Sequence, residues 1–268
     1  MANERLGFDN VPEIYDRARP SYPDALFDDL LAYLDAPPGQ PVRAVEIGAG
    51  TGKATASLLE RGIEVTAVEI GANLAAFLKN KFVGLKPDLR GKLTVINAAF
   101  EDVALDREAY DLVVSATAFH WVDPAVRYTK SHDLLRAGGV IAIVSTNQIA
   151  SGVDRGYFDR VRPIYLKYWP DEQLTELPGE DVTPAEHGEL LASGLFGDAT
   201  LRRYRWDQTY PTAQYADLVR SYANTQAMEH EAAEAMVAEV CDLVDREYGG
   251  SVTRPLVMTL TLGRKSAG

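Results

Sequence analysis

A glycine loop between an apolar run and a helical pattern constrains this chain more than any other feature. The apolar run covers residues 42–47 and leads into VEIGAGTG at residues 45–52, after which apolar residues up to Leu59 recur with helical spacing. A strand, a glycine turn and a helix let the backbone approach a nucleotide-like ligand closely, because glycine has no Cβ. The G-x-G-x-G spacing matches neither the dinucleotide fingerprint nor the P-loop. It therefore favours a ligand without a pyrophosphate.

Strand and helix patterns alternate on both sides of this loop. Strand patterns occur near residues 42–47, 64–69, 93–98, 110–116 and 139–145, and helical patterns near 21–34, 52–61, 72–84 and 123–136. Such alternation predicts a doubly wound, Rossmann-like α/β fold with a mostly parallel sheet. The apolar run from Val140 to Val144 is typical of a strand covered on both faces. Ser21 is the predicted N-cap of the first helix, and Gly138-Gly139 are the predicted end of the last.

The alternation ends after Thr146. The remaining patterns indicate a helix, a loop, a strand, two helices and a final strand, near residues 154–169, 170–198, 200–208, 212–228, 230–247 and 252–262. Two late strands separated by helices predict an antiparallel end to the sheet. We expect one domain over residues 1–268, with an N-terminal cap segment at 1–40 that is irregular at 8–23. Helical lid insertions on the substrate side are expected at 150–198 and 211–248.

The composition narrows the classes of partner. The 268 residues include 27 Lys and Arg against 39 Asp and Glu, for a formal net charge of −12, and the basic residues form no cluster of the kind that binds phosphates. We therefore expect no nucleic-acid partner. Cys241 is the only cysteine, which excludes an intrachain disulfide and a cysteine-based zinc cluster. No apolar run is long enough to cross a bilayer and no signal core follows Met1, so we expect a cytoplasmic protein without membrane contact.

A carboxylate provides the second signal for a nucleotide-like ligand. Glu69 ends the strand pattern at 64–69, about twenty residues after the glycine turn, where a fold of this type places the partner of the ribose hydroxyls. A carboxylate can accept hydrogen bonds from both vicinal hydroxyls. A solvated acid at a strand end is the simpler interpretation of Glu69 alone. Its combination with the glycine loop favours ligand binding.

Several further motifs complete a pattern that resembles a known family. They are Tyr15-Asp16, Arg19-Pro20, Phe100-Glu101 and Phe119-His120-Trp121. With VEIGAGTG and Glu69, they make the chain similar to class I S-adenosylmethionine-dependent methyltransferases, particularly the small-molecule group related to trans-aconitate methyltransferase. The resemblance implies a seven-stranded sheet with its last strand antiparallel. It also implies S-adenosylmethionine as cofactor, S-adenosylhomocysteine as product, and no metal.

The resemblance also implies which residues contact the cofactor. They are Tyr15, Arg19, Glu46, Gly48, Ala49, Gly50, Thr51, Gly52, Glu69, Ile70, Phe100, Glu101, Ser115 and Ala116. The glycine loop would line the methionine portion, and Glu46 would help to hold its ammonium group. Glu69 would take the ribose hydroxyls, and Ile70 would pack on adenine. Acids suit this site because the sulfonium and ammonium groups are cationic.

The remaining cofactor contacts come from other segments of the chain. By the same resemblance, Phe100 and Glu101 would border the adenine ring and its exocyclic amine. Ser115 and Ala116 would offer backbone carbonyls where the strand pattern at 110–116 ends. The two residues from the N-terminal segment would close the cofactor site from that side.

A histidine and a tryptophan lie just past the same strand. In open α/β sheets ligands bind at the carboxyl ends of the strands, so His120 and Trp121 are the candidate substrate-binding residues. A neutral imidazole can accept a proton from a hydroxyl nucleophile, which makes His120 the candidate general base. It could equally bind or orient a substrate carboxylate or hydroxyl. A loop histidine with only local hydrogen bonds is the third interpretation.

Other acceptor classes lack their usual signals. Amino-nucleobase methyltransferases carry Asp or Asn, two prolines and an aromatic residue after the fourth strand, whereas residues 115–119 read SATAF. Methylation at pyrimidine C5 uses a cysteine nucleophile, but Cys241 falls in a late helical pattern. His132, His187 and His230 have no metal-ligand spacing. The aromatic residues between 157 and 169, together with Trp206 and Tyr210, are either a lid over an apolar pocket or ordinary core.

These observations predict methyl transfer from S-adenosylmethionine to a small-molecule acceptor, most readily at a carboxylate or hydroxyl oxygen. One alternative is a class I fold whose chemistry has drifted. Another is a non-catalytic protein that retains the cofactor site. Nothing in the sequence identifies the acceptor or the oligomeric state.

Overall fold

The computed structural model describes residues 7–37, 39–83, 91–170 and 176–266. Its centre is a seven-stranded sheet in the order β3-β2-β1-β4-β5-β7-β6. The strands are β1 Arg43–Ile47, β2 Glu64–Glu69, β3 Leu93–Asn97, β4 Tyr110–Ala116, β5 Leu135–Gln148, β6 Phe196–Pro211 and β7 Ser251–Lys265. β1 to β5 pair in parallel, whereas β7 is antiparallel to both β5 and β6. This confirms the predicted Rossmann-like sheet with its last strand antiparallel.

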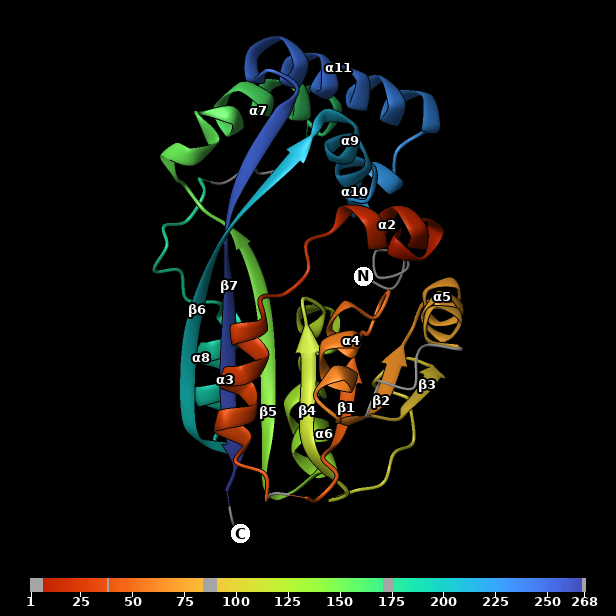
Figure 1. Ribbon diagram of the computed structural model, residues 1–268, viewed down its shortest axis with the longest axis vertical. Helices are drawn as coiled ribbons and strands as arrows, with labels where there is room; N and C mark the ends of the chain where they lie inside the picture. The colour runs from red at the N-terminus through yellow and green to blue at the C-terminus, as the bar shows by residue number, and fades with distance from the viewer. Residues whose placement is uncertain (1–6, 38, 84–90, 171–175, 267–268) are drawn as a thin grey trace.

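Helices cover both faces of the sheet (Figure 1). The helices are α3 Asp24–Leu34, α4 Lys53–Glu60 and α5 Ala72–Phe82 on one face, and α6 Arg127–Leu134 and α8 Ala185–Ser193 on the other. Successive strand residues point to opposite faces. Leu112 therefore packs under the first set of helices, and Val113 packs under the second. Burial on both sides explains why these strands read as continuous apolar runs.

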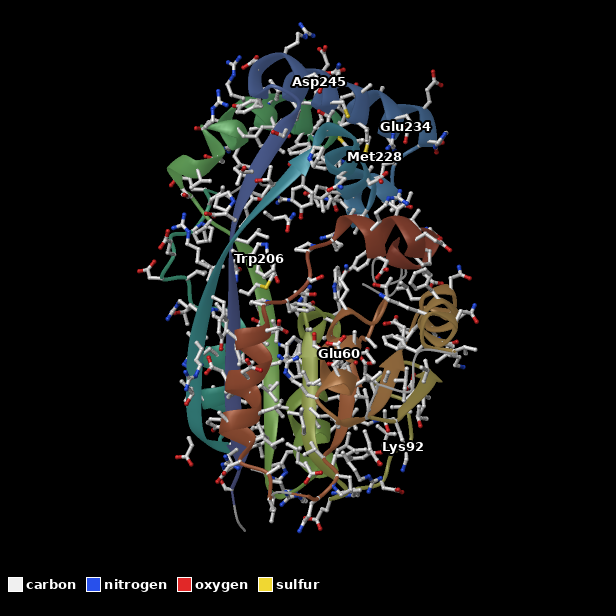
Figure 2. The ribbon with its side chains drawn as sticks, in the orientation of Figure 1. Glu60, Lys92, Trp206, Met228, Glu234 and Asp245 are labelled. Atoms are coloured by element: carbon white, nitrogen blue, oxygen red, sulfur yellow. The ribbon has the colours of Figure 1, made fainter. Side chains whose placement is uncertain are left out.

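A helical cap lies beyond the carboxyl ends of the parallel strands. β6 and β7 continue past the other strands and carry α7 Tyr157–Tyr168, α9 Thr212–Arg220, α10 Ala223–Gln226 and α11 His230–Tyr248 (Figure 1). Tyr157 is fully buried in the core of this cap, with its ring edge-on to Tyr215 and Tyr248 at centroid distances of 5.4 and 5.2 Å. The aromatic residues of α7 are therefore mainly core. Trp206 lies on β6, below the cap (Figure 2).

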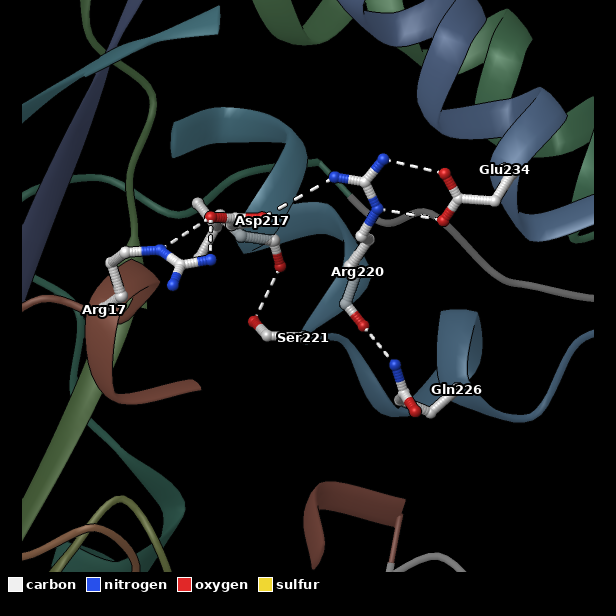
Figure 3. A network of polar contacts seen from close by, with 7 residues as sticks. Arg17, Asp217, Arg220, Ser221, Gln226 and Glu234 are labelled. Carbon is white, nitrogen blue, oxygen red and sulfur yellow. Dashed lines mark hydrogen bonds and ion pairs between the residues drawn. The ribbon is translucent and has the colours of Figure 1, made fainter. Parts of the chain in front are cut away.

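The N-terminal segment is helical rather than irregular. After a short turn of 3₁₀-helix, η1 Gly7–Asn10, the chain forms α2 Pro12–Ala18. The prediction of an irregular lead-in was wrong here, because Pro12 starts a helix well at its first position. α2 packs on α9, where the Arg17 guanidinium binds the Asp217 carboxylate at 2.6 Å. Figure 3 shows this pair continuing through Arg220 and Glu234 to α11.

Several predicted boundaries were wrong. α3 begins after Pro23, and Ser21 is not its cap. Tyr22 precedes Pro23, and a residue before proline is held extended, so the helix does not start earlier. α6 begins at Arg127, after a turn of 3₁₀-helix, η2 Phe119–Trp121. It ends at Leu134, and Gly138 and Gly139 lie within β5 where its pairing with β4 shifts register. Residue 84, the predicted end of α5, is outside the described residues.

Two other predictions missed local structure in the second half of the chain. The predicted loop at 170–198 contains α8 and the start of β6, while residues 171–175 lie outside the description. The predicted helix at 212–228 is interrupted after Arg220. The interruption exposes Tyr222 to the space between the cap and the sheet, where it lines a cavity.

Candidate active site

A cavity of about 450 Å³ lies between the carboxyl ends of the parallel strands and the helical cap. Its floor is the end of β1, the glycine loop and the end of β2, and its far wall comes from β5, β7 and the cap. This is the edge at which open α/β sheets bind ligands, and the volume is typical of a small-molecule site. Of the sequence-predicted site residues, all except Gly52 and Ser115 line this cavity.

The glycine loop has the backbone that only glycine adopts easily. Gly48 has φ +67°, and a Cβ there would overlap the Ala118 side chain. A Cβ on Gly52 would instead clash with Leu78 and Phe82 of α5. Gly52 thus serves the packing of α4 against α5 and does not line the cavity. Thr51 lines the cavity, and its buried hydroxyl has no hydrogen-bond partner among the described residues.

Glu69 ties the end of β2 to the glycine loop. Its side chain is 4% exposed, and its two oxygens accept hydrogen bonds from the backbone N–H groups of Gly50 (2.7 Å) and Gly71 (2.8 Å). Burial raises the pKa of Glu69, and the backbone hydrogen bonds act against this rise. The carboxylate is held in one orientation at the cavity wall. Each oxygen retains a lone pair for a ligand hydroxyl.

A second acid, Glu46, lies at the base of the cavity. It is 1% exposed and accepts a hydrogen bond from the Thr55 hydroxyl at 2.6 Å. Burial raises the pKa of Glu46 to about 8, the Thr55 hydroxyl opposes the rise, and the Glu69 charge adds to it. Without a cation beside it, Glu46 is mostly protonated at neutral pH. A cationic ligand group would favour its ionised form.

The wall beyond Glu69 is apolar apart from one acid. Ile70, Phe100 and Glu101, which the resemblance assigns to the adenine side, line this part of the cavity. Phe100 is buried, with the Lys130 ammonium 5.2 Å from its ring centre. Glu101 accepts a hydrogen bond from the Asp123 backbone N–H at 2.9 Å. The wall is therefore held in shape by contacts behind it.

At the end of β4, the structure separates two residues that the sequence analysis grouped. Ser115 is buried, and its hydroxyl donates to the Ile47 carbonyl at 3.0 Å behind the cavity wall. Ala116 lines the cavity, and so does Thr117, which the sequence analysis missed. Thr117 has φ +57°, an uncommon conformation for a β-branched residue. Such backbone strain concentrates at functional sites.

His120 lies where two cavities meet. It lines the main cavity, with Trp121, and also a smaller neighbouring cavity of about 220 Å³ that Glu186 borders. Desolvation lowers the pKa of His120, the Glu186 carboxylate opposes this shift, and Arg127 adds to it. The imidazole is therefore neutral at pH 7 and able to accept a proton.

The N-terminal segment forms one side of the cavity. Tyr15 and Arg19 both line it. The Arg19 guanidinium lies 5.1 Å from the ring centres of Tyr15 and Tyr222, and it donates to the Ser221 hydroxyl at 3.0 Å. These contacts join α2 to the break between α9 and α10.

The sequence analysis also missed the polar residues at the cap end of the cavity. Gln148 ends β5, Tyr222 lies between α9 and α10, and Arg254 lies in β7. No spacing in the sequence links these three residues. A single charged residue, Arg254, within the strand pattern at 252–262 was the one available signal.

The described residues contain neither a cluster of metal-ligating side chains nor a membrane-spanning helix. No group of three or more His, Cys, Asp or Glu side chains in this part of the chain is placed to hold a metal ion. No helix formed by these residues has the length and apolar character needed to cross a membrane.

Comparison with known proteins gives the sheet and its cavity a family context. Residues 45–143 match the family model of the methyltransferase domain. A Mycobacterium tuberculosis protein described as an uncharacterized methyltransferase is 35% identical over 139 residues, which are 52% of this chain and 51% of that protein. A Saccharomyces cerevisiae protein described as a probable S-adenosylmethionine-dependent methyltransferase is 30% identical over 198 residues, covering 71% and 65%. The chain therefore spans about half to two thirds of these relatives.

Solved structures show the same fold at low identity. A structure from Anaeromyxobacter dehalogenans aligns with a TM-score of 0.61 and 20% identity, covering 92% of this chain and 97% of that one. The phosphoethanolamine N-methyltransferase 2 of Haemonchus contortus, solved with S-adenosyl-L-methionine, aligns with a TM-score of 0.52 and 14% identity, covering 98% and 57%. Residues 45–143, which contribute to β1 and include β2 to β4 and most of β5, thus match a methyltransferase domain, and the fold of the chain is that of solved methyltransferases.

Proposed function

We propose that this protein transfers a methyl group from S-adenosylmethionine to an oxygen atom, carboxylate or hydroxyl, of a small molecule. The observation that carries the proposal is one continuous cavity with two buried acids at the glycine-loop end and His120 beside the end of β4. The resemblance to the trans-aconitate methyltransferase group supports an oxygen acceptor. We take the protein to act in the cytoplasm, without nucleic acid or membrane as partner.

The residues at the glycine-loop end suit this cofactor. Glu69 would accept the ribose hydroxyls, Glu46 would face the ammonium group, and the free hydroxyl of Thr51 would find a partner. Ile70 and Phe100 offer an apolar surface for adenine. When bound, S-adenosylmethionine supplies a methyl group on a positively charged sulfur. The acids of this chain offset that positive charge in a site of low dielectric.

The rest of the cavity provides the conditions for an in-line displacement. The cap and the N-terminal segment cover the cavity and limit the access of water. The strand ends hold the acceptor oxygen in a defined orientation, which is the main contribution that a protein makes to such a reaction. If the acceptor is a carboxylate, no base is needed, and His120 orients it. If it is a hydroxyl, the neutral His120 imidazole takes its proton.

The alternatives differ in what they require of the site. A class I fold with drifted chemistry would keep the cofactor contacts and lose methyl transfer. A non-catalytic binding protein would do the same without any acceptor site. A nitrogen acceptor is named for the Haemonchus enzyme. The sequence SATAF at residues 115–119 disfavours only one class of nitrogen acceptor, the amino group of a nucleobase.

Calorimetric titration with S-adenosylhomocysteine, followed by assays with methyl-labelled S-adenosylmethionine and a panel of small acids and alcohols, tests the proposal. Binding together with labelled ester or ether product supports it. No measurable binding would refute it, and binding without transfer to any oxygen acceptor would favour a drifted or non-catalytic protein. His120→Gln should slow transfer, whereas His230→Gln, at the exposed start of α11, should not.

A further inference from the structure

An arginine that forms no ion pair with the described part of the chain lies at the cap end of the cavity. Arg254 is on β7, between Thr253 and Pro255, and its side chain lines the cavity. Its two terminal nitrogens donate to the Tyr222 hydroxyl and to the Gln148 side-chain oxygen. Its third nitrogen, Nε, is buried and has no acceptor among the described residues. The Gln148 amide nitrogen is also buried and without an acceptor there.

None of the carboxylates that the structure describes forms an ion pair with Arg254. The groups around its guanidinium are neutral, with ring centres of Phe158 and Tyr222 at 5.7 and 5.9 Å. The absence of an ion pair to Arg254 does not reflect a low content of acidic residues, because the chain has 39 of them. A desolvated charge without a partner is costly, and so is a buried donor without an acceptor. An anion from outside the chain would satisfy both.

The carboxylates that line the cavity are gathered at one end, although two cations besides Arg254, Lys53 and Arg19, also line it. The acids that line it, Glu46, Glu69 and Glu101, all lie at the glycine-loop and adenine end. Arg254 and Gln148 lie at the other end, where the unpaired groups are donors. A cationic ligand therefore fits one end, and an anionic ligand fits the other.

We propose that Arg254, with Gln148 and Tyr222, binds a carboxylate group of the methyl acceptor. This inference rests on the proposed function. The planar guanidinium offers parallel N–H donors that match the two oxygens of a carboxylate. The free amide nitrogen of Gln148 is a further donor, and the Tyr222 hydroxyl can rotate to donate as well. The Arg19 guanidinium, 5.1 Å from the ring centre of Tyr222, adds positive charge nearby and further favours an anionic group.

The anchoring carboxylate is separate from the oxygen that is methylated. In the sheet, Ala116 of β4 pairs with Val144 of β5, and Gln148 lies four residues further along β5. Four residues of a strand span about 13 Å. The proposed anchor is thus distant from Thr117 and His120, where the reacting oxygen would lie. The acceptor class is an elongated small molecule with a carboxylate at one end and an acceptor oxygen at the other.

The test uses the full chain saturated with S-adenosylhomocysteine and titrated with the dicarboxylates from succinate to suberate. At least one should bind, and its diamide should bind about ten- to a hundred-fold more weakly, because a hydrogen bond to a charged group is lost. Arg254→Gln should weaken the dicarboxylate by a similar factor, and Arg254→Lys should recover part of it. Arg246→Gln, on the exposed face of α11, is the matched control.

The outcomes separate this inference from the proposed function. Equal binding of diacid and diamide to the unchanged protein would overturn the carboxylate site without any variant that must fold. S-adenosylhomocysteine binding without any dicarboxylate binding would overturn it too, and would leave cofactor binding intact. Failure of S-adenosylhomocysteine to bind would instead refute the proposed function. Arg254→Gln should leave S-adenosylhomocysteine affinity and the thermal midpoint close to those of the unchanged protein, which a purely structural arginine would not.

Discussion

Glu46 should couple cofactor binding to proton release. Because burial raises the pKa of Glu46 to about 8, about nine in ten molecules hold this proton at pH 7 before a ligand binds. A ligand ammonium group would favour the ionised form and expel the proton. If the new charge-assisted hydrogen bond is worth about 1.5–3 kcal/mol, titration of S-adenosylhomocysteine at pH 7, in two buffers with different ionisation enthalpies, should report about 0.5–0.85 proton released per molecule bound.

The same linkage sets the pH dependence of the affinity. The ionised fraction of Glu46 rises from about 1% at pH 6 to about 9% at pH 7 and about half at pH 8. With a charge-assisted hydrogen bond of about 1.5–3 kcal/mol in the complex, the affinity for S-adenosylhomocysteine should rise about two- to sixfold between pH 6 and 7 and about three- to fivefold between pH 7 and 8. A charge-assisted hydrogen bond is worth about 1.5–3 kcal/mol, and ionisation at pH 7 costs about 1.4 kcal/mol of this. Glu46→Gln should thus weaken binding at pH 7 by at most about fifteenfold.

The variant has a clear signature beyond the loss of affinity. Glu46→Gln should bind with no pH dependence and release no proton, whereas Glu60→Gln, an exposed acid on α4 (Figure 2), should behave like the unchanged protein. The pH dependence of the stability of the free protein tests whether the pKa of Glu46 is raised. A raised pKa means that Glu46 contributes stability below pH 4.5, and that this contribution is lost as the pH rises towards 8. Binding without proton release, or a flat affinity from pH 6 to 8 in the unchanged protein, would refute the reasoning.

Three further predictions follow from the cavity wall. Gly48→Ala should lower the free energy of unfolding by about 2–3 kcal/mol and abolish S-adenosylhomocysteine binding, because the new Cβ overlaps Ala118 at a positive φ. Gly249 has a similar φ and open space around it, so Gly249→Ala should lower the free energy of unfolding by only about 1 kcal/mol in a urea titration. Thr51→Val should leave the urea midpoint unchanged or higher, since the hydroxyl has no hydrogen-bond partner among the described residues. The same change should weaken the binding of S-adenosylhomocysteine several-fold. Equal affinity would show that the hydroxyl does not contact the cofactor. With a hydroxyl acceptor, the transfer rate should be flat above about pH 6.5 and fall as His120 is protonated below its lowered pKa, and a limb that persists in His120→Gln would assign it to another group.

The sequence alone determined the sheet and the floor of the cavity, because both depend on short stretches of chain. A strand, a glycine loop and a helix are adjacent in sequence, and their pattern requires the turn that Gly48 makes. Glu69 lies 19 residues after Gly50, and the right-handed connection between parallel strands brings the two into hydrogen-bond contact. The antiparallel last strand followed from the order of the late elements in the same way.

The sequence could not predict which residues at the end of a buried strand face the cavity. β4 is apolar on both faces, so no alternation distinguished Ser115, which points behind the wall, from Ala116, which lines the cavity. Short helices such as α2 and α8 were missed because they have few turns in which to show an apolar stripe.

Only the tertiary structure decided the cap end of the cavity. Gln148, Tyr222 and Arg254 come from β5, from the break between α9 and α10, and from β7, and none of them constrains the others locally. They meet because β7 is inserted antiparallel beside β5 and because the helix at 212–228 is interrupted. Local chemistry therefore specified where the cofactor would lie, whereas long-range packing specified what can lie beside it.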